Sequence, residues 1–98
     1  MGRKGYKMKE DTVVFILEDH LDADEVFVVG NFMGWESGEK DWRMELVDGH
    51  WELEVEKDRL SGGFDEFTFV VDGEWLDADK DAENVNYCAG HGYRYVIE

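Results

Sequence analysis

Two of the four tryptophans lie beside turns rather than inside a strand pattern. Trp35 closes a glycine-bracketed loop, and Trp75 follows the Asp72-Gly73 turn by two residues. An exposed indole can stack on the apolar face of a pyranose ring, while polar neighbours bond the sugar hydroxyl groups. Trp35 and Trp75 are therefore candidates for a sugar-binding platform. They could equally plug the ends of the domain, and the residues alone leave both interpretations open.

A second candidate site lies in residues 77–81, which read Asp-Ala-Asp-Lys-Asp and resemble the opening of an EF-hand loop. The sixth position is Ala82 where that loop needs glycine, and the twelfth is Cys88 where it needs glutamate. A solvated acidic loop is the simpler interpretation, and a calcium-binding domain stays an alternative. The three histidines show no zinc-ligand spacing, so we expect no metal ligands and no cofactor.

Catalysis is not expected, although 25 carboxylates make a glycosidase pair easy to imagine. A catalytic acid needs an enclosing pocket that raises its pKa. A sandwich of 98 residues has little volume for such a pocket. The sequence therefore predicts a protein that is not an enzyme and has no catalytic residues.

The formal net charge of −15 excludes two classes of partner. Nucleic acids and anionic membrane surfaces attract basic faces, and an acidic surface repels them. Four of the ten basic residues lie in the first nine positions, which predicts a flexible basic tail over residues 1–10. The single cysteine excludes an internal disulfide and favours a reducing, cytoplasmic location. No apolar run is long enough to span a membrane.

The elements that must position the tryptophans follow a period of two. Residues 51–56 alternate without interruption, which puts Trp51 on an inward face and three glutamates in water. Trp42, in a charged loop, has no clear assignment. Turn signals such as Asp48-Gly49 and Asp72-Gly73 separate six or seven short strands. This pattern predicts one all-β domain over residues 11–98, an immunoglobulin-like (early-set) antiparallel β-sandwich.

Three stretches of the chain match motifs that occur together in one known family. Residues 26–35 resemble a strand followed by Gly-Asp-Phe-Asn-Gly-Trp. Residues 49–53 resemble a Gly-x-Trp-x-Leu strand, and residues 60–75 resemble a Tyr-Lys-Phe strand with an Asp-Gly-x-Trp turn. With these motifs in this order, roughly residues 12–98 resemble the family-48 carbohydrate-binding module, which includes the glycogen-binding domain of the AMP-activated protein kinase β subunit.

The resemblance implies non-catalytic binding of an α-1,4-linked glucan such as glycogen or starch. It places the family's two sugar-stacking tryptophans at Trp35 and Trp75. The kinase subunit's sugar-contacting lysine corresponds to Thr68, and the asparagine near the last strand to Arg94 or a neighbour. With Asn84, these complete the carbohydrate-binding residues that we expect. The resemblance also implies a catalytic or kinase-type partner protein, and the alternative function is a protein-interaction or regulatory module.

Overall fold

The computed structural model describes residues 5–36, 38–60, 65–77, 84–88 and 92–97. These segments form nine strands and three single-turn 3-10 helices. The strands are β1 (Tyr6–Met8), β2 (Thr12–Leu17), β3 (Val26–Gly30), β4 (Glu45–Val47), β5 (His50–Glu56), β6 (Asp65–Val71), β7 (Glu74–Trp75), β8 (Val85–Cys88) and β9 (Gly92–Ile97). The 3-10 helices are η1 (Asn31–Met33), η2 (Lys40–Trp42) and η3 (Lys57–Arg59). None of these described helices is long and apolar enough to cross a membrane.

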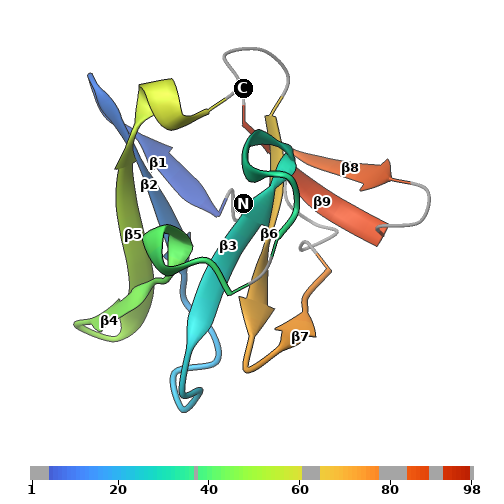
Figure 1. Ribbon diagram of the computed structural model, residues 1–98. Coiled ribbons are helices and arrows are strands. Elements are labelled where there is room, and N and C mark those ends of the chain that lie inside the picture. The colour runs from blue at the N-terminus through green and yellow to red at the C-terminus, as the bar shows by residue number, and fades with distance from the viewer. Residues whose placement is uncertain (1–4, 37, 61–64, 78–83, 89–91, 98) are drawn as a thin grey trace.

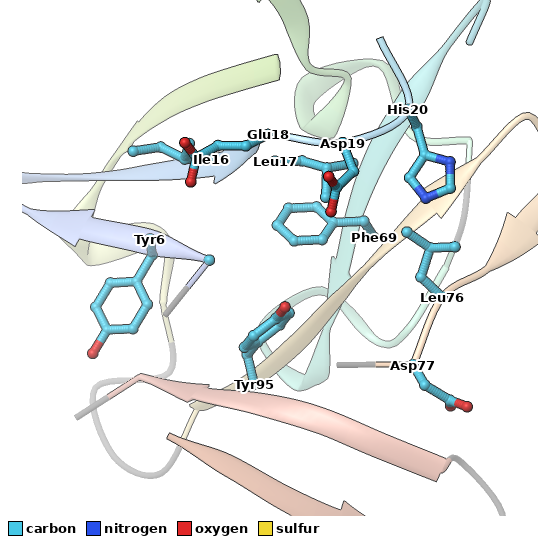
Figure 2. A pocket seen from close by; sticks show the side chains of 11 residues that line it. Tyr6, Ile16, Leu17, Glu18, Asp19, His20, Phe69, Leu76, Asp77 and Tyr95 are labelled. Atoms are coloured by element: carbon cyan, nitrogen blue, oxygen red, sulfur yellow. The ribbon is translucent and has the colours of Figure 1, made fainter. Parts of the chain in front are cut away.

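The strands form two antiparallel sheets, which confirms the prediction of an all-β sandwich. The first sheet has the order β1-β2-β5-β4, and the second has the order β3-β6-β9-β8, with β7 added to β6. Figure 1 shows the two sheets facing each other as separate layers. A cavity of about 360 Å³ lies between them where β2 ends (Figure 2).

The register between β2 and β5 explains why the alternating segment forms an inner strand. Val13, Phe15 and Leu17 pair with Val55, Leu53 and Trp51, so the apolar side chains of both strands point to the same face. The three glutamates of β5 lie on the opposite face. Trp51 is 5% exposed, which confirms its assignment to the core.

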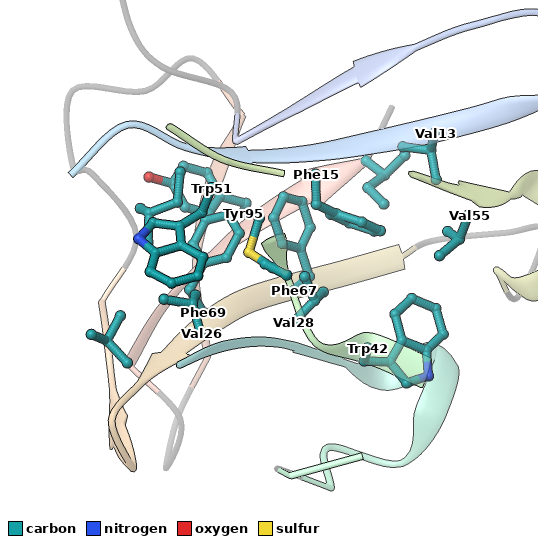
Figure 3. Packing of buried hydrophobic residues seen from close by; sticks show 14 residues of the cluster. Val13, Phe15, Val26, Val28, Trp42, Trp51, Val55, Phe67, Phe69 and Tyr95 are labelled. Carbon is teal, nitrogen blue, oxygen red and sulfur yellow. The ribbon is translucent and has the colours of Figure 1, made fainter. Parts of the chain in front are cut away.

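Aromatic side chains make up the centre of the core, as Figure 3 shows. The ring of Phe67 lies 4.9 Å from that of Phe15, 5.6 Å from Phe69 and 5.3 Å from Tyr95. Trp42 is also buried, with its ring centroid 6.2 Å from that of Phe15. The loop that carries Trp42 is therefore anchored by its indole, which resolves the uncertainty about this residue.

Part of the segment expected to be a flexible tail forms strand β1. Tyr6–Met8 pairs with β2, and the ring of Tyr6 packs edge-on against Phe67 at 6.0 Å. Gly5 has a φ of +76°, and a Cβ there would lie 3.1 Å from the Phe67 ring. Hydrogen bonding to β2 and contact with the core therefore hold residues 6–8 in place, although three residues alone carry no periodic signal.

Candidate functional site

Trp35 is held by a tight loop that follows β3. Its backbone N–H donates to the carbonyl of Gly30 at 2.9 Å, which closes the loop around η1. The Asn31 side-chain oxygen accepts the N–H of Glu66 at 3.0 Å and fixes the loop to β6. A Cβ at Gly30 would lie 2.5 Å from the Glu66 carbonyl oxygen, so no side chain fits there. Trp35 itself has a φ of +59°, a left-handed conformation that this loop imposes.

Trp75 is positioned by a two-residue hairpin. Asp72 and Gly73 both have positive φ, at 48° and 86°, as a type I′ turn requires. The carboxylate of Asp72 also accepts two backbone N–H groups from the loop before β3, at 2.9 and 3.0 Å. The hairpin pairs Trp75 with Val70 on β6. Trp75 therefore lies on the outer face of the second sheet, because cross-strand partners share a face.

The structure brings these two tryptophans together, although 40 positions separate them in the chain. Their ring centroids lie 6.3 Å apart and their planes are tilted by 32°. Trp75 is 41% exposed and Trp35 is half-buried. We call Trp35 and Trp75 the indole pair. Both rings thus keep surface in contact with solvent, which the buried Trp42 and Trp51 do not.

Arg94 lies beneath the indole pair. Its guanidinium carbon is 5.8 Å from the centroid of Trp35 and 5.7 Å from that of Trp75, within the range of a cation–π interaction. The group is almost completely buried, and it donates to the Tyr93 carbonyl at 2.8 Å and to the Leu76 carbonyl at 3.4 Å. Asp77 supplies an opposite charge at 3.7 Å. Arg94 therefore links both rings to the backbone below them.

Thr68 and Asn84, which we expected to contact sugar, are both buried. The Thr68 hydroxyl donates to the Leu76 carbonyl at 2.6 Å, the same carbonyl that Arg94 contacts. The Asn84 side chain donates to the Val96 carbonyl at 2.8 Å. The structure therefore places Thr68 as a support for the segment that follows Trp75. Asn84 is held by a hydrogen bond to the backbone of β9 at Val96.

Sequence reasoning missed the contribution of Leu76 and Asp77. Leu76 acts through its backbone carbonyl, which has no signature in the sequence. Asp77 belonged to an acidic loop in our interpretation, whereas its carboxylate pairs with Arg94 and lies against Gly92, where a Cβ would approach it to 2.5 Å. The rest of the proposed calcium loop, residues 78–81, lies outside the described residues.

Among the residues that the structure describes, no three His, Cys, Asp or Glu side chains gather in a way that could hold a metal ion. Neither tryptophan of the indole pair lines the inter-sheet cavity, although Leu76 and Asp77, which follow Trp75, do. What the indole pair offers is two adjacent apolar ring faces over a buried cation. No protein-family model and no curated protein matches the chain.

Proposed function

We propose that this protein is a non-catalytic, immunoglobulin-like module that binds α-1,4-linked glucan such as glycogen or starch on the indole pair. The observation that carries the proposal is the meeting of two partly exposed indoles on the outer face of the second sheet, one held by the loop after β3 and the other by the β6–β7 hairpin, with their planes tilted by 32°. The resemblance to the family-48 carbohydrate-binding module, which assigns sugar stacking to the same two residues, supports it independently of that geometry.

Stacking is the main source of affinity in this proposal. A pyranose that covers about 50 Å² of apolar area on both itself and an indole gains on the order of 2 kcal/mol. Successive rings of an α-1,4-glucan turn relative to one another, whereas those of cellulose form a flat ribbon. Two indole faces tilted by 32° suit a curved chain better than a flat one.

The polar contacts contribute little to this affinity, because Thr68, Asn84 and Arg94 are buried and engaged with backbone carbonyls. Sugar hydroxyl groups are then bonded mainly by water at the edges of the rings. Two stacked rings and few direct hydrogen bonds correspond to dissociation constants of roughly 10 μM to 1 mM.

Calorimetric titration of the full chain with β-cyclodextrin, maltoheptaose and cellohexaose tests the proposal. The two α-glucans should bind in the range given above, and cellohexaose should not bind measurably. Tyr87→Ala serves as the control for variants of the indole pair. Tyr87 is also an exposed aromatic residue, 63% exposed on β8, but it should not contribute to the site, so its replacement should leave glucan affinity unchanged. Equal binding of cellohexaose would contradict the α-glucan assignment. Absence of binding to every glucan would favour the protein-interaction module instead.

A further inference from the structure

Two polar side chains are joined across strand β9 on the second sheet. The Asn86 side-chain amide donates to the Glu66 carboxylate at 3.1 Å. Asn86 is exposed on β8 and Glu66 is half-buried on β6, and these two strands lie on either side of β9. The hydrogen bond therefore passes over β9 at the surface of the sheet. We call Asn86 and Glu66 the polar pair.

The strand register places the polar pair on the same face as the indole pair. Asn86 is the cross-strand partner of Arg94, whose guanidinium lies beneath both indoles. Glu66 comes four residues before Val70 on β6, so these two side chains share a face. Val70 is the partner of Trp75. All of these side chains therefore belong to the outer face of the second sheet.

The backbone of Glu66 also holds the loop that carries Trp35. Its N–H donates to the Asn31 side chain at 3.0 Å, and Gly30 lies so close to its carbonyl oxygen that no Cβ would fit. Glu66 therefore connects the loop of the indole pair, through its peptide group, to Asn86 at the outermost strand, through its carboxylate. The polar pair continues the outer face from the Trp35 end of the indole pair toward β8.

The chemistry of the polar pair suits sugar hydroxyl groups, which both donate and accept hydrogen bonds. The bond to Glu66 fixes the orientation of the Asn86 amide, which has a carbonyl acceptor and two N–H donors. A carboxylate has about four lone-pair sites, so Glu66 can accept a sugar hydroxyl in addition to its protein partners. A few placed polar groups beside an apolar surface are what orients a ligand in a binding site.

We propose that the polar pair is a further glucan subsite, which binds the hydroxyl groups of the glucose unit next to those stacked on the indole pair. This inference rests on the proposed function. The glucan runs from Trp75 past Trp35 toward β8, so a chain longer than two units reaches Asn86. Maltose fills only the two stacked positions and makes no contact with the polar pair. Water bonds the stacked units, whereas the unit beyond them is bonded directly by protein.

Titration of the isotope-labelled full chain with maltose and with maltoheptaose tests the subsite. The Asn86 side-chain amide gives its own NMR signals. We expect maltoheptaose to shift them saturably, with the same dissociation constant as the indole signals of Trp35 and Trp75. Maltose should shift the two indole signals only. If maltoheptaose moves the indole signals and not those of Asn86, the subsite is wrong and glucan binding stands. If neither sugar moves the indole signals, both proposals fail.

A variant at Asn86 measures what the subsite contributes. Asn86→Ala should lower maltoheptaose affinity about threefold to tenfold, as expected for the loss of one or two hydrogen bonds, and should leave maltose affinity nearly unchanged. Tyr87→Ala is the control, because Tyr87 follows on the same edge strand but faces the other side of the sheet, and it should change neither affinity. Unchanged maltoheptaose affinity in Asn86→Ala, or an equal loss for both sugars, would overturn a separate subsite.

Two variants at Glu66 keep the test decisive if Asn86→Ala does not fold. Glu66→Gln removes the charge but keeps an oxygen that accepts the Asn86 amide, so maltoheptaose affinity should stay within about twofold. Glu66→Ala loses both the acceptor and the orientation of Asn86, and it should weaken maltoheptaose about threefold to tenfold. Full maltoheptaose affinity in Glu66→Ala would contradict the role of the polar pair.

Discussion

The four tryptophans form two pairs with opposite surroundings. Trp42 and Trp51 are each 5% exposed and belong to the cluster that joins the sheets. Trp35 and Trp75 lie outside that cluster, on the loop after β3 and on the short strand β7, with a buried arginine beneath them. The same side chain thus fills the core in one region and forms a supported surface in the other. The two roles differ in where the backbone places the ring and in how much of the ring stays exposed to solvent.

The arginines near these rings sharpen the contrast. Arg59 lies 5.2 Å from the ring centroid of Trp42, but its side chain is 43% exposed, so solvent screens this contact. Arg94 is buried and contacts both members of the indole pair. Desolvation strengthens a cation–π interaction, so Arg94 should contribute more than Arg59 to holding its rings in place.

The largest effect should come from opening the core at Trp51. Trp51→Ala removes a buried indole whose N–H donates to the His20 carbonyl at 2.9 Å, and it leaves a cavity between the sheets. We expect the free energy of unfolding to fall by about 3–5 kcal/mol in urea titrations. Trp51→Phe should lose less, because it retains an aromatic ring. A loss below about 1 kcal/mol for Trp51→Ala would contradict its role in the core.

Removal of either member of the indole pair should have the reverse effect, a large loss of glucan affinity and a small loss of stability. Trp35→Ala and Trp75→Ala should each lower β-cyclodextrin affinity about tenfold or more, since one stacked ring is worth on the order of 2 kcal/mol. Their free energy of unfolding should change much less than in Trp51→Ala. Calorimetry and urea titration on the same samples measure both quantities. If Trp35→Ala or Trp75→Ala unfolds as readily as Trp51→Ala, that indole belongs to the core and not to a sugar-binding surface.

A smaller effect should follow from replacing the buried cation. Arg94→Met keeps an apolar stem but loses the contact with both rings and the pairing with Asp77. We expect glucan affinity to fall about threefold to tenfold, the equivalent of about 1 kcal/mol. Arg94→Lys keeps the charge without the planar group, so its glucan affinity should lie between those of the unchanged protein and Arg94→Met. Unchanged affinity in Arg94→Met would show that the indole pair needs no support from below.

The sequence predicted those parts of the fold that local patterns encode. Alternation predicted the inner strand around Trp51, and the Asp72-Gly73 hairpin has the positive φ angles that its residue types suggest. Strand β1 was missed because three residues give no period and form a strand only through pairing with β2. Trp42 had no assignment from the sequence because its burial depends on Phe15 and other partners distant in the chain.

The candidate site was less predictable than the fold. The two indoles could be singled out because a large ring beside a turn is unusual. The burial of Thr68 could not be predicted, because alternation puts this residue on an outer face and the sequence does not show that this face is covered. Val29 and Val70 are buried on the same outer face, outside the core cluster. The support of the indole pair by Arg94 and a backbone carbonyl is likewise a product of tertiary packing.

The smallest effect concerns Glu54, on the sheet opposite the indole pair. The Thr12 hydroxyl donates to its carboxylate at 2.6 Å and, with Lys9, holds the pKa of Glu54 below its ordinary value of 4.5. A depressed pKa adds stability above the unfolded-state pKa, and this stability is lost as pH falls through the folded-state value. Thr12→Val should raise the pKa of Glu54 in a carboxyl NMR titration. Glucan affinity should not change, and a change would contradict the separation of the two faces.

The most direct test uses the four tryptophans together. Each indole N–H gives its own NMR signal, so one titration with β-cyclodextrin compares both pairs in the same molecule. We predict saturable shifts for Trp35 and Trp75, with one dissociation constant, and no significant shift for Trp42 and Trp51. Cellohexaose at the same concentration should move none of the four. Shifts of Trp42 or Trp51 as large as those of the indole pair, or signals that do not respond to β-cyclodextrin at all, would contradict glucan binding on the indole pair.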